Sequence, residues 1–138
     1  MKAYKTIIKF FGGKAMKKMK RVLIVDDAAF VRLAIRTILE KNGYEVVGEA
    51  NDGNVAVAKY MELRPDFITL DITMPNMDGI ETLKAIRNFD KNAVVIMVSA
   101  LGQERYIKDA VLNGAKYFLV KPFKEDDVIE TIRKIVGA

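Results

Sequence analysis

Carboxylates, one hydroxyl and one ammonium are the groups best placed for chemistry in this sequence, because each directly follows or ends a short apolar run. The candidate residues are Asp26, Asp27, Asp71, Ser99 and Lys121. The chain has no histidine and no cysteine, so imidazole and thiolate chemistry are excluded. Any reaction must therefore use carboxylates, hydroxyls, lysines and bound ions.

Three carboxylates that meet at one place need either protonation or a cation. Two carboxylates about 4 Å apart repel by roughly 4 kcal/mol at an effective dielectric constant near 20. Lys121 supplies a single positive charge, which does not balance three acids. An all-oxygen ligand set with room for water suits Mg²⁺ better than Zn²⁺ or Ca²⁺. With the metal bound, one carboxylate can attack phosphorus and form an acyl phosphate.

Each residue taken alone also has a plainer interpretation. Asp27 is placed to cap the helix that follows it, and Asp71 can serve a turn. Ser99 alone is typical of a turn, and Lys121 alone is typical of the surface. Their joint placement at the ends of four apolar runs favours one shared site.

The elements that must position these residues alternate along the chain. Short apolar runs rich in β-branched and aromatic residues predict five strands, at residues 22–25, 45–50, 67–70, 93–98 and 117–120. At least three runs are apolar throughout, which is typical of a parallel sheet covered on both faces. Segments of helical period separate and follow them. The pattern predicts a (βα)5 open α/β sandwich, in which ligands bind beyond the carboxyl ends of the strands.

Charge is distributed unevenly along the chain. Residues 1–21 carry eight Lys or Arg and no acid, whereas the other 117 residues carry 15 basic and 18 acidic side chains. We expect residues 1–19 to be a basic leader that is disordered or non-native, and residues 20–138 to form one domain. The acidic body argues against direct DNA binding. No apolar stretch approaches the roughly 18 residues that a membrane span needs.

Four motifs carry a resemblance to response-regulator receiver domains, and within that family to the CheY-like receivers. They are VLIVDDAAFVR (22–32), DITMPNMDG (71–79), MVSALG (97–102) and GAKYFLVKPF (114–123). The resemblance covers about residues 20–138. It implies a doubly wound, flavodoxin-like sandwich with strand order 2-1-3-4-5, an order for which CheY is itself a reference example.

The resemblance also implies a phosphorylation site with a metal ion. Asp71 matches the phosphoacceptor of the family. Asp26 and Asp27 match the acidic pair that binds Mg²⁺ together with Asp71. The backbone carbonyl of Thr73, two residues further on, matches the remaining protein ligand.

Three more positions match residues that respond to the phosphoryl group. Ser99 matches the hydroxyl that follows it, and Lys121 matches the lysine that pairs with it. The bond between Lys121 and Pro122 is expected to be cis. Phe118 matches the switch aromatic, which turns inward and reshapes the face of the fourth helix, fifth strand and fifth helix.

Two positions depart from common family patterns. Thr73 stands where Asn or another polar residue is frequent, and Leu101 is apolar where some members carry an acid. Both flank the expected path of the hydrolytic water. We hypothesise a long-lived phosphoryl group, because Leu101 excludes water better than a charged side chain does.

The implied protein is a monomeric, cytoplasmic single-domain response regulator of chemotaxis or motility. It would take its phosphoryl group from a histidine kinase of the CheA type and bind a downstream motor or adaptor protein. It would catalyse its own phosphorylation and dephosphorylation without being a conventional turnover enzyme. The alternative within the family is a stand-alone receiver of another phosphorelay.

Two further alternatives are weaker. A phosphatase of the haloacid dehalogenase type needs a second acid where Thr73 stands. An inactive receiver used only for binding would not need the full set of acids, serine and lysine.

Overall fold

The computed structural model describes residues 9–11, 14–16 and 20–136. Two short strands, β1 (Lys9–Phe11) and β2 (Lys14–Met16), pair with each other in antiparallel fashion. They belong to the basic leader, and the other residues of 1–19 lie outside the described ones. The expectation of a disordered or non-native leader therefore stays a prediction.

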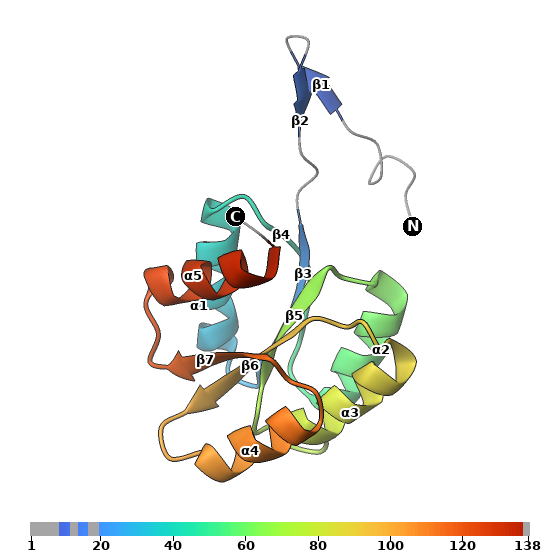
Figure 1. Ribbon diagram of the computed structural model, residues 1–138, viewed down its shortest axis with the longest axis vertical. Helices are drawn as coiled ribbons and strands as arrows, with labels where there is room; N and C mark the ends of the chain where they lie inside the picture. The colour runs from blue at the N-terminus through green and yellow to red at the C-terminus, as the bar shows by residue number, and fades with distance from the viewer. Residues whose placement is uncertain (1–8, 12–13, 17–19, 137–138) are drawn as a thin grey trace.

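Five parallel strands form the main sheet (Figure 1). They are β3 (Arg21–Val25), β4 (Glu45–Ala50), β5 (Phe67–Asp71), β6 (Val95–Ala100) and β7 (Tyr117–Lys121). Their order is β4-β3-β5-β6-β7, which is 2-1-3-4-5 among the sheet strands, as predicted. Strand β6 lies further along the chain than the predicted run at residues 93–98, so Ser99 is inside the strand rather than after it.

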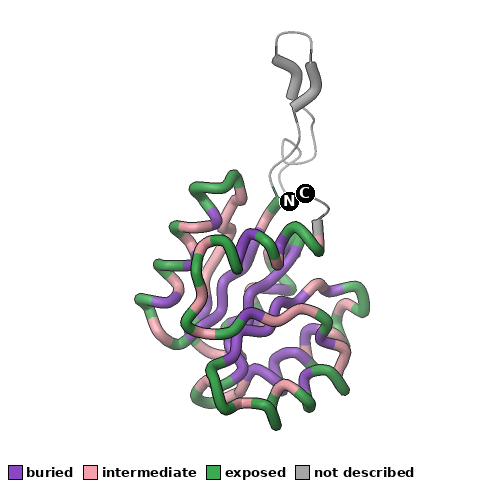
Figure 2. The backbone as a smooth tube through the Cα atoms, turned by 60° about the vertical axis from the view of Figure 1, so that its left-hand side comes forward, coloured by how far each residue is buried: buried purple, intermediate pink, exposed green. Residues whose placement is uncertain are grey.

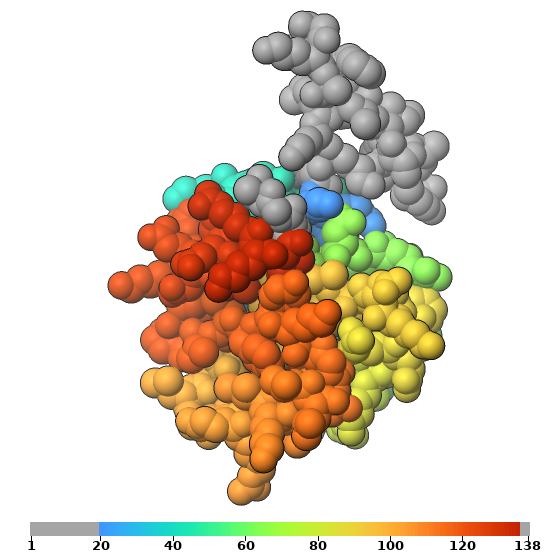
Figure 3. Space-filling view, in the orientation of Figure 1, coloured from blue at the N-terminus to red at the C-terminus, as the bar shows by residue number. Residues whose placement is uncertain are grey.

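Five helices cover the two faces of this sheet. They are α1 (Ala29–Lys41), α2 (Gly53–Leu63), α3 (Gly79–Phe89), α4 (Glu104–Leu112) and α5 (Glu125–Val136). Ile35 of α1 and Ile132 of α5 pack with Ile24 on one face of the sheet. Residues of α2, α3 and α4, including Tyr60 and Leu83, pack on the other face. The chain from α3 to α5 forms most of the surface visible in Figure 3.

Burial follows this layered arrangement. Strand β5 is buried along its whole length, whereas the edge strands β4 and β7 are mostly half-buried. Buried backbone accordingly concentrates in the interior strands (Figure 2). The unbroken apolar runs of the sequence are explained by this position, because a central parallel strand has helices on both sides.

The ends of the helices agree with the sequence in part. Gly43 and Gly114 follow α1 and α4 with positive φ, as their Asn-Gly pairs predict. The predicted cap by Asp27 is wrong, because α1 begins after Ala28 without a side-chain cap. Asp26 instead accepts a hydrogen bond from the Ala28 backbone N–H at 2.9 Å, and this contact shapes the turn into α1.

Among the residues that the structure describes, none of the helices has the length and apolar character needed to cross a bilayer.

Candidate functional site

The parallel register brings the predicted residues together at the carboxyl ends of the strands. Asp71, the last residue of β5, lies opposite Val98 of β6. Lys121, the last residue of β7, lies opposite Ala100. Asp26 directly follows β3, whose backbone pairs with β5. The carboxyl ends of four neighbouring strands therefore present their polar groups together.

Three carboxylates form a close cluster at this edge. Asp26, Asp27 and Asp71 each offer an oxygen that lies within 4.8 Å of the other two. Asp26 and Asp71 are buried, whereas Asp27 is exposed. The Lys121 ammonium lies 2.9 Å from Asp26 Oδ2 and 3.6 Å from Asp71 Oδ1. The contact with Asp26 is the closer of the two, and a carboxylate oxygen that accepts from one ammonium still has a lone pair available for a cation.

Without a bound cation, the surroundings of Asp71 disfavour its charged form. Burial raises the pKa of Asp71 to about 6, and the neighbouring Asp26 and Asp27 carboxylates contribute in the same direction. Lys121 and a hydrogen bond from the Thr73 backbone offset part of this rise. Burial lowers the pKa of the Lys121 ammonium, but the Asp26 and Asp71 carboxylates outweigh it and the net pKa is raised.

Ser99 lies next to this cluster along β6 and is fully buried. Its Oγ has no hydrogen-bond partner among the described residues. Buried polar atoms without partners are uncommon in folded proteins and call for an explanation. Together with the carboxylate cluster beside it, this hydroxyl indicates a place for an oxygen-rich ligand.

The aromatic and flanking residues occupy different environments. Phe118 is half-buried and packs against the apolar cluster on the α2–α4 face. Thr73 is exposed beside Asp71. Leu101 is 79% exposed, so its side chain does not cover the acidic cluster in this conformation. The bond between Lys121 and Pro122 is cis, which confirms the expectation.

Backbone contacts fix the acids in place. The Arg32 guanidinium donates to the Asp26 carbonyl at 2.6 Å. After β5, the Gly79 N–H donates to the Ile72 carbonyl at 2.7 Å and closes the loop that follows Asp71. A Cβ at position 79 would lie only 2.6 Å from Ile72 Cα, so only glycine allows this approach.

Sequence reasoning missed Gln103. Its Oε1 accepts a hydrogen bond from the Ala100 N–H at 2.6 Å, and its Nε2 donates to Thr73 Oγ1 at 3.4 Å. Gln103 thereby connects the segment after β6 with the segment after β5, on either side of Asp71. Nothing in the sequence around Gln103 signals this role, because it depends on two loops that meet only in the fold.

The donor set of the cluster fits a hard divalent cation. All three candidate ligands are carboxylates, and no histidine or cysteine is present in the chain. Hard cations such as Mg²⁺ prefer oxygen ligands and retain several waters, for which the exposed side of Asp27 leaves access. A cation there would also relieve the repulsion between the acids.

A parallel sheet in this order, with an acidic cluster, a buried serine and a lysine at its carboxyl edge, defines a response-regulator receiver domain. The family model of the response regulator receiver domain matches residues 22–133, and the chain belongs to this family. Membership makes it a signalling protein and disfavours the phosphatase alternative.

Relatives place the chain within the CheY-like part of the family. Chemotaxis protein CheY of Bacillus subtilis is 57% identical over 117 residues, which cover 85% of this chain and 98% of the relative. CheY of Thermotoga maritima is 53% identical over 116 residues, covering 84% and 97%. A solved CheX–CheY–BeF3–Mg complex from Borrelia burgdorferi matches with a TM-score of 0.81 at 44% identity, covering 86% of this chain and 90% of that chain. The chain is therefore a CheY-like receiver.

Proposed function

We propose that this protein is a single-domain response regulator that accepts a phosphoryl group on Asp71 from a histidine kinase of the CheA type. One observation carries most of this proposal. The buried Asp71 carboxylate lies 3.6 Å from the Lys121 ammonium and shares an oxygen cluster with Asp26 and Asp27. A nucleophile, a metal site and a fixed positive charge thus lie together.

The residues have definite roles in the transfer step. A carboxylate oxygen of Asp71 attacks phosphorus, the P–N bond of the donor phosphohistidine breaks, and the leaving imidazole takes a proton from solvent. Mg²⁺, when bound, would neutralise charge on the phosphoryl oxygens. The Lys121 ammonium pairs with one phosphoryl oxygen, and the Ser99 hydroxyl donates to another. Attack of water on phosphorus later breaks the bond between phosphorus and the Asp71 oxygen, releases inorganic phosphate and restores the Asp71 carboxylate.

The proposed metal ligands are supported by the carboxylate cluster and by the family resemblance. Asp26, Asp27 and Asp71 supply carboxylate oxygens, and the backbone carbonyl of Thr73 supplies a further one. The solved Borrelia burgdorferi relative is named as a complex with Mg and BeF3, which supports a Mg²⁺ site in this chain.

The signal would leave through the face formed by α4, β7 and α5. When Ser99 moves toward the phosphoryl group, Phe118 turns inward and this face changes shape. A hollow of about 520 Å³ lies there, lined among others by Leu101, Phe118 and Lys134. The relatives are named as chemotaxis proteins, which supports a partner in chemotaxis; the partner proposed here is a motor or adaptor protein of the cytoplasm.

One relative favours a second candidate function. Protein CcdB of Bacillus subtilis is 50% identical over 119 residues, which cover 99% of its length, and its name does not place it in chemotaxis. A stand-alone receiver in another phosphorelay would use the same site and differ only in kinase and target.

Acetyl phosphate provides the direct test of the acceptor. The full chain is incubated with acetyl phosphate and Mg²⁺, and its mass is then measured. We expect a gain of one phosphoryl group that is absent in Asp71→Asn and in the presence of EDTA. Absence of any gain in the wild type would overturn the proposal. Phosphotransfer from a CheA-type kinase, compared with kinases of other phosphorelays, separates the two candidate functions.

A further inference from the structure

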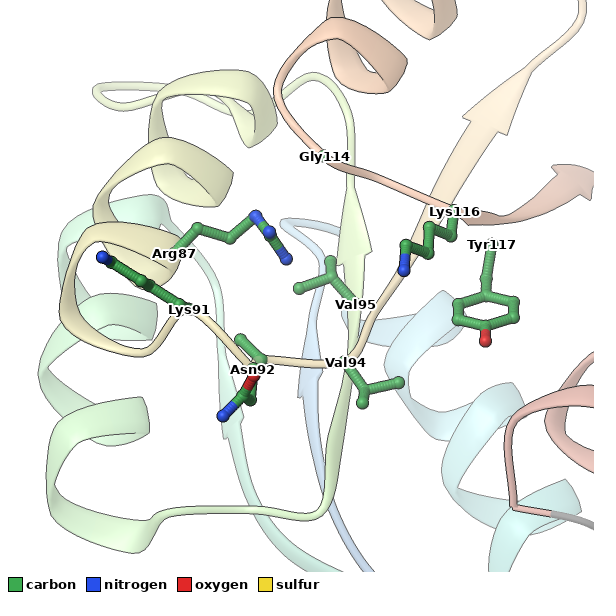
Figure 4. Close-up of a pocket in the computed structure, with 9 residues that line it drawn as sticks. Arg87, Lys91, Asn92, Val94, Val95, Gly114, Lys116 and Tyr117 are labelled. Carbon is green, nitrogen blue, oxygen red and sulfur yellow. The ribbon is translucent and has the colours of Figure 1, made fainter.

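A polar pocket lies at the amino ends of β6 and β7, whereas Asp71 lies at the carboxyl end of β5 on the other side of the sheet's length (Figure 4). Its volume is about 210 Å³. The end of α3, the segment that leads into β6 and the segment between α4 and β7 form its walls. Its lining includes Arg87, Lys91 and Lys116 and no acidic residue.

The three cations of this pocket are not balanced by acids. Within the part of the chain that the structure describes, no carboxylate forms an ion pair with Arg87, Lys91 or Lys116. The nearby Asp90 keeps its charge, but its oxygens accept hydrogen bonds from the Tyr60 hydroxyl and from the Asn92 backbone, and it does not line the pocket. A pocket lined by three cations and no acid is unexpected in this part of the chain, because residues 22–138 carry more acidic than basic side chains.

Arg87 belongs to the wall of the pocket that α3 provides. It is half-buried and lies directly against Gly114. A Cβ at position 114 would approach Arg87 Cζ to 2.8 Å, so glycine is needed for the guanidinium to lie over this backbone. Gly114 also has φ of +94°, which other residues rarely adopt. Glycine at position 114 therefore leaves space for the guanidinium beside this backbone.

Two of the cations point toward the same space. Figure 4 shows the Arg87 guanidinium and the Lys116 ammonium on either side of Val95, with the Asn92 side chain below them. The Lys91 ammonium points away from the pocket in the same view. The arrangement thus offers a planar donor fork and a point charge on two sides of one small volume.

The carbonyl ends of α3 and α4 also lie at this edge, and their dipoles attract cations. That attraction explains positive charge near the helix ends, but it does not explain why Arg87 and Lys116 converge on a pocket without acids. We propose that this pocket binds a small anion that carries a phosphate group, with Arg87 and Lys116 as the principal donors. Arginine forks and lysine point charges are the usual phosphate ligands among side chains. A volume below the roughly 300 Å³ of pockets for larger ligands suits phosphate or pyrophosphate.

The proposal is tested by titration of the ¹⁵N-labelled full chain with inorganic phosphate and, separately, with pyrophosphate. EDTA removes Mg²⁺, and sodium chloride keeps the ionic strength constant. We expect saturable shifts of the Gly114 and Lys116 amides with a Kd on the order of 1 mM or tighter. Residue-specific shifts are essential, because the basic leader and Lys121 can also attract anions.

Variants decide whether the pocket is responsible. Arg87→Ala and Lys116→Ala should each weaken binding at least about tenfold, whereas Lys84→Ala should leave it unchanged. Lys84 is exposed on the same helix as Arg87 and does not line the pocket, so its variant loses the same charge elsewhere. Spectra of each variant before titration show that the fold is kept. Shifts that never saturate, that occur only near Lys121 or the leader, or that weaken equally in Lys84→Ala would overturn the proposal.

Discussion

At the scale of single residues, Asp71 shows how the proposed chemistry opposes stability. It is 5% exposed and shares its edge with two other carboxylates. An ordinary protein interior would not hold three acids beside one lysine, because buried charge without full compensation is costly. A bound cation would compensate the charge of the three acids, and the same site could then accept a phosphoryl group.

Asp71→Asn should raise the free energy of unfolding of the metal-free protein at neutral pH by about 3 kcal/mol. The pKa of Asp71 is raised from 3.8 to about 6 in the folded protein. The stabilising contribution of a raised carboxyl pKa is present below the unfolded pKa and is lost as pH rises through the folded pKa. Urea unfolding in EDTA measures the effect. Added Mg²⁺ should stabilise the wild type more than the variant, and a variant less stable in EDTA would contradict the charge argument.

Leu101→Glu should shorten the lifetime of the phosphorylated protein by about three- to tenfold. Leu101 follows Ser99 by two residues and is exposed, so a carboxylate there can reach water near the phosphoryl group and orient it. Leucine cannot do so. Loss of the phosphoryl mass over time measures the rate. Leu112→Glu is the matched control, since Leu112 is 75% exposed on α4. Equal rates in wild type and Leu101→Glu would end the account of a long-lived phosphoryl group.

At the scale of elements, side-chain networks tie the edge strand β4 to α1. Glu49 of β4 accepts from Arg32 Nε at 2.9 Å and from Arg36 Nε at 2.7 Å. Arg32 also donates to the Asp26 carbonyl, so the network reaches the acidic cluster. Burial raises the pKa of Glu49, but the hydrogen bonds from both arginines outweigh it and the net pKa is lowered.

Glu49→Gln should destabilise the protein by about 1 kcal/mol at neutral pH, because these charges are partly screened by solvent. A lowered carboxyl pKa contributes stability above the unfolded value, here 4.5, and this is lost as pH falls through the folded value. The difference between variant and wild type should therefore shrink in acid. Urea unfolding across pH tests this, with Glu62→Gln on the exposed side of α2 as the control. A difference independent of pH would rule out the ion-pair explanation.

Gly79→Ala should cost about 2–3 kcal/mol of stability, because the added methyl group presses on backbone rather than on a flexible side chain. Gly79 begins α3 and closes the loop after Asp71, so the strain should also slow phosphorylation by acetyl phosphate. Gly48→Ala is a useful comparison, since a Cβ there approaches the flexible end of Leu63 at 2.9 Å. If both variants lose similar stability, the close backbone approach at Gly79 is not what matters.

At the scale of the whole molecule, alternation of strands and helices was sufficient to locate the site. Parallel strands place their carboxyl ends at one edge, so Asp71 and Lys121 are brought together by topology alone. Contacts that depend on rotamers and loop approach could not be predicted in this way. Gln103 bridges two loops, and Arg87 lies over Gly114 from a different helix. The spacing of these residues along the sequence does not indicate that they lie in contact.

The basic leader, residues 1–19, bears on the charge of the whole molecule. The contacts recorded between β1 and β2 are with each other, while the sheet and its helices belong to residues 20–136. Residues 1–19 contain six lysines and no acid, so their removal changes the net charge from +5 to −1. We propose that residues 20–138 keep the full receiver, because both apolar clusters and the acidic cluster lie within them.

A chain of residues 20–138 should therefore unfold at the same urea concentration as the full chain and accept a phosphoryl group at the same rate. Its retention on a cation exchanger should be lost, because long-range attraction to an anionic surface follows net charge. A full chain in which the six leader lysines are changed to Gln separates charge from length. A fall in stability on deletion, but not on the Lys-to-Gln change, would show that the leader packs on the receiver and that the boundary at residue 20 is wrong.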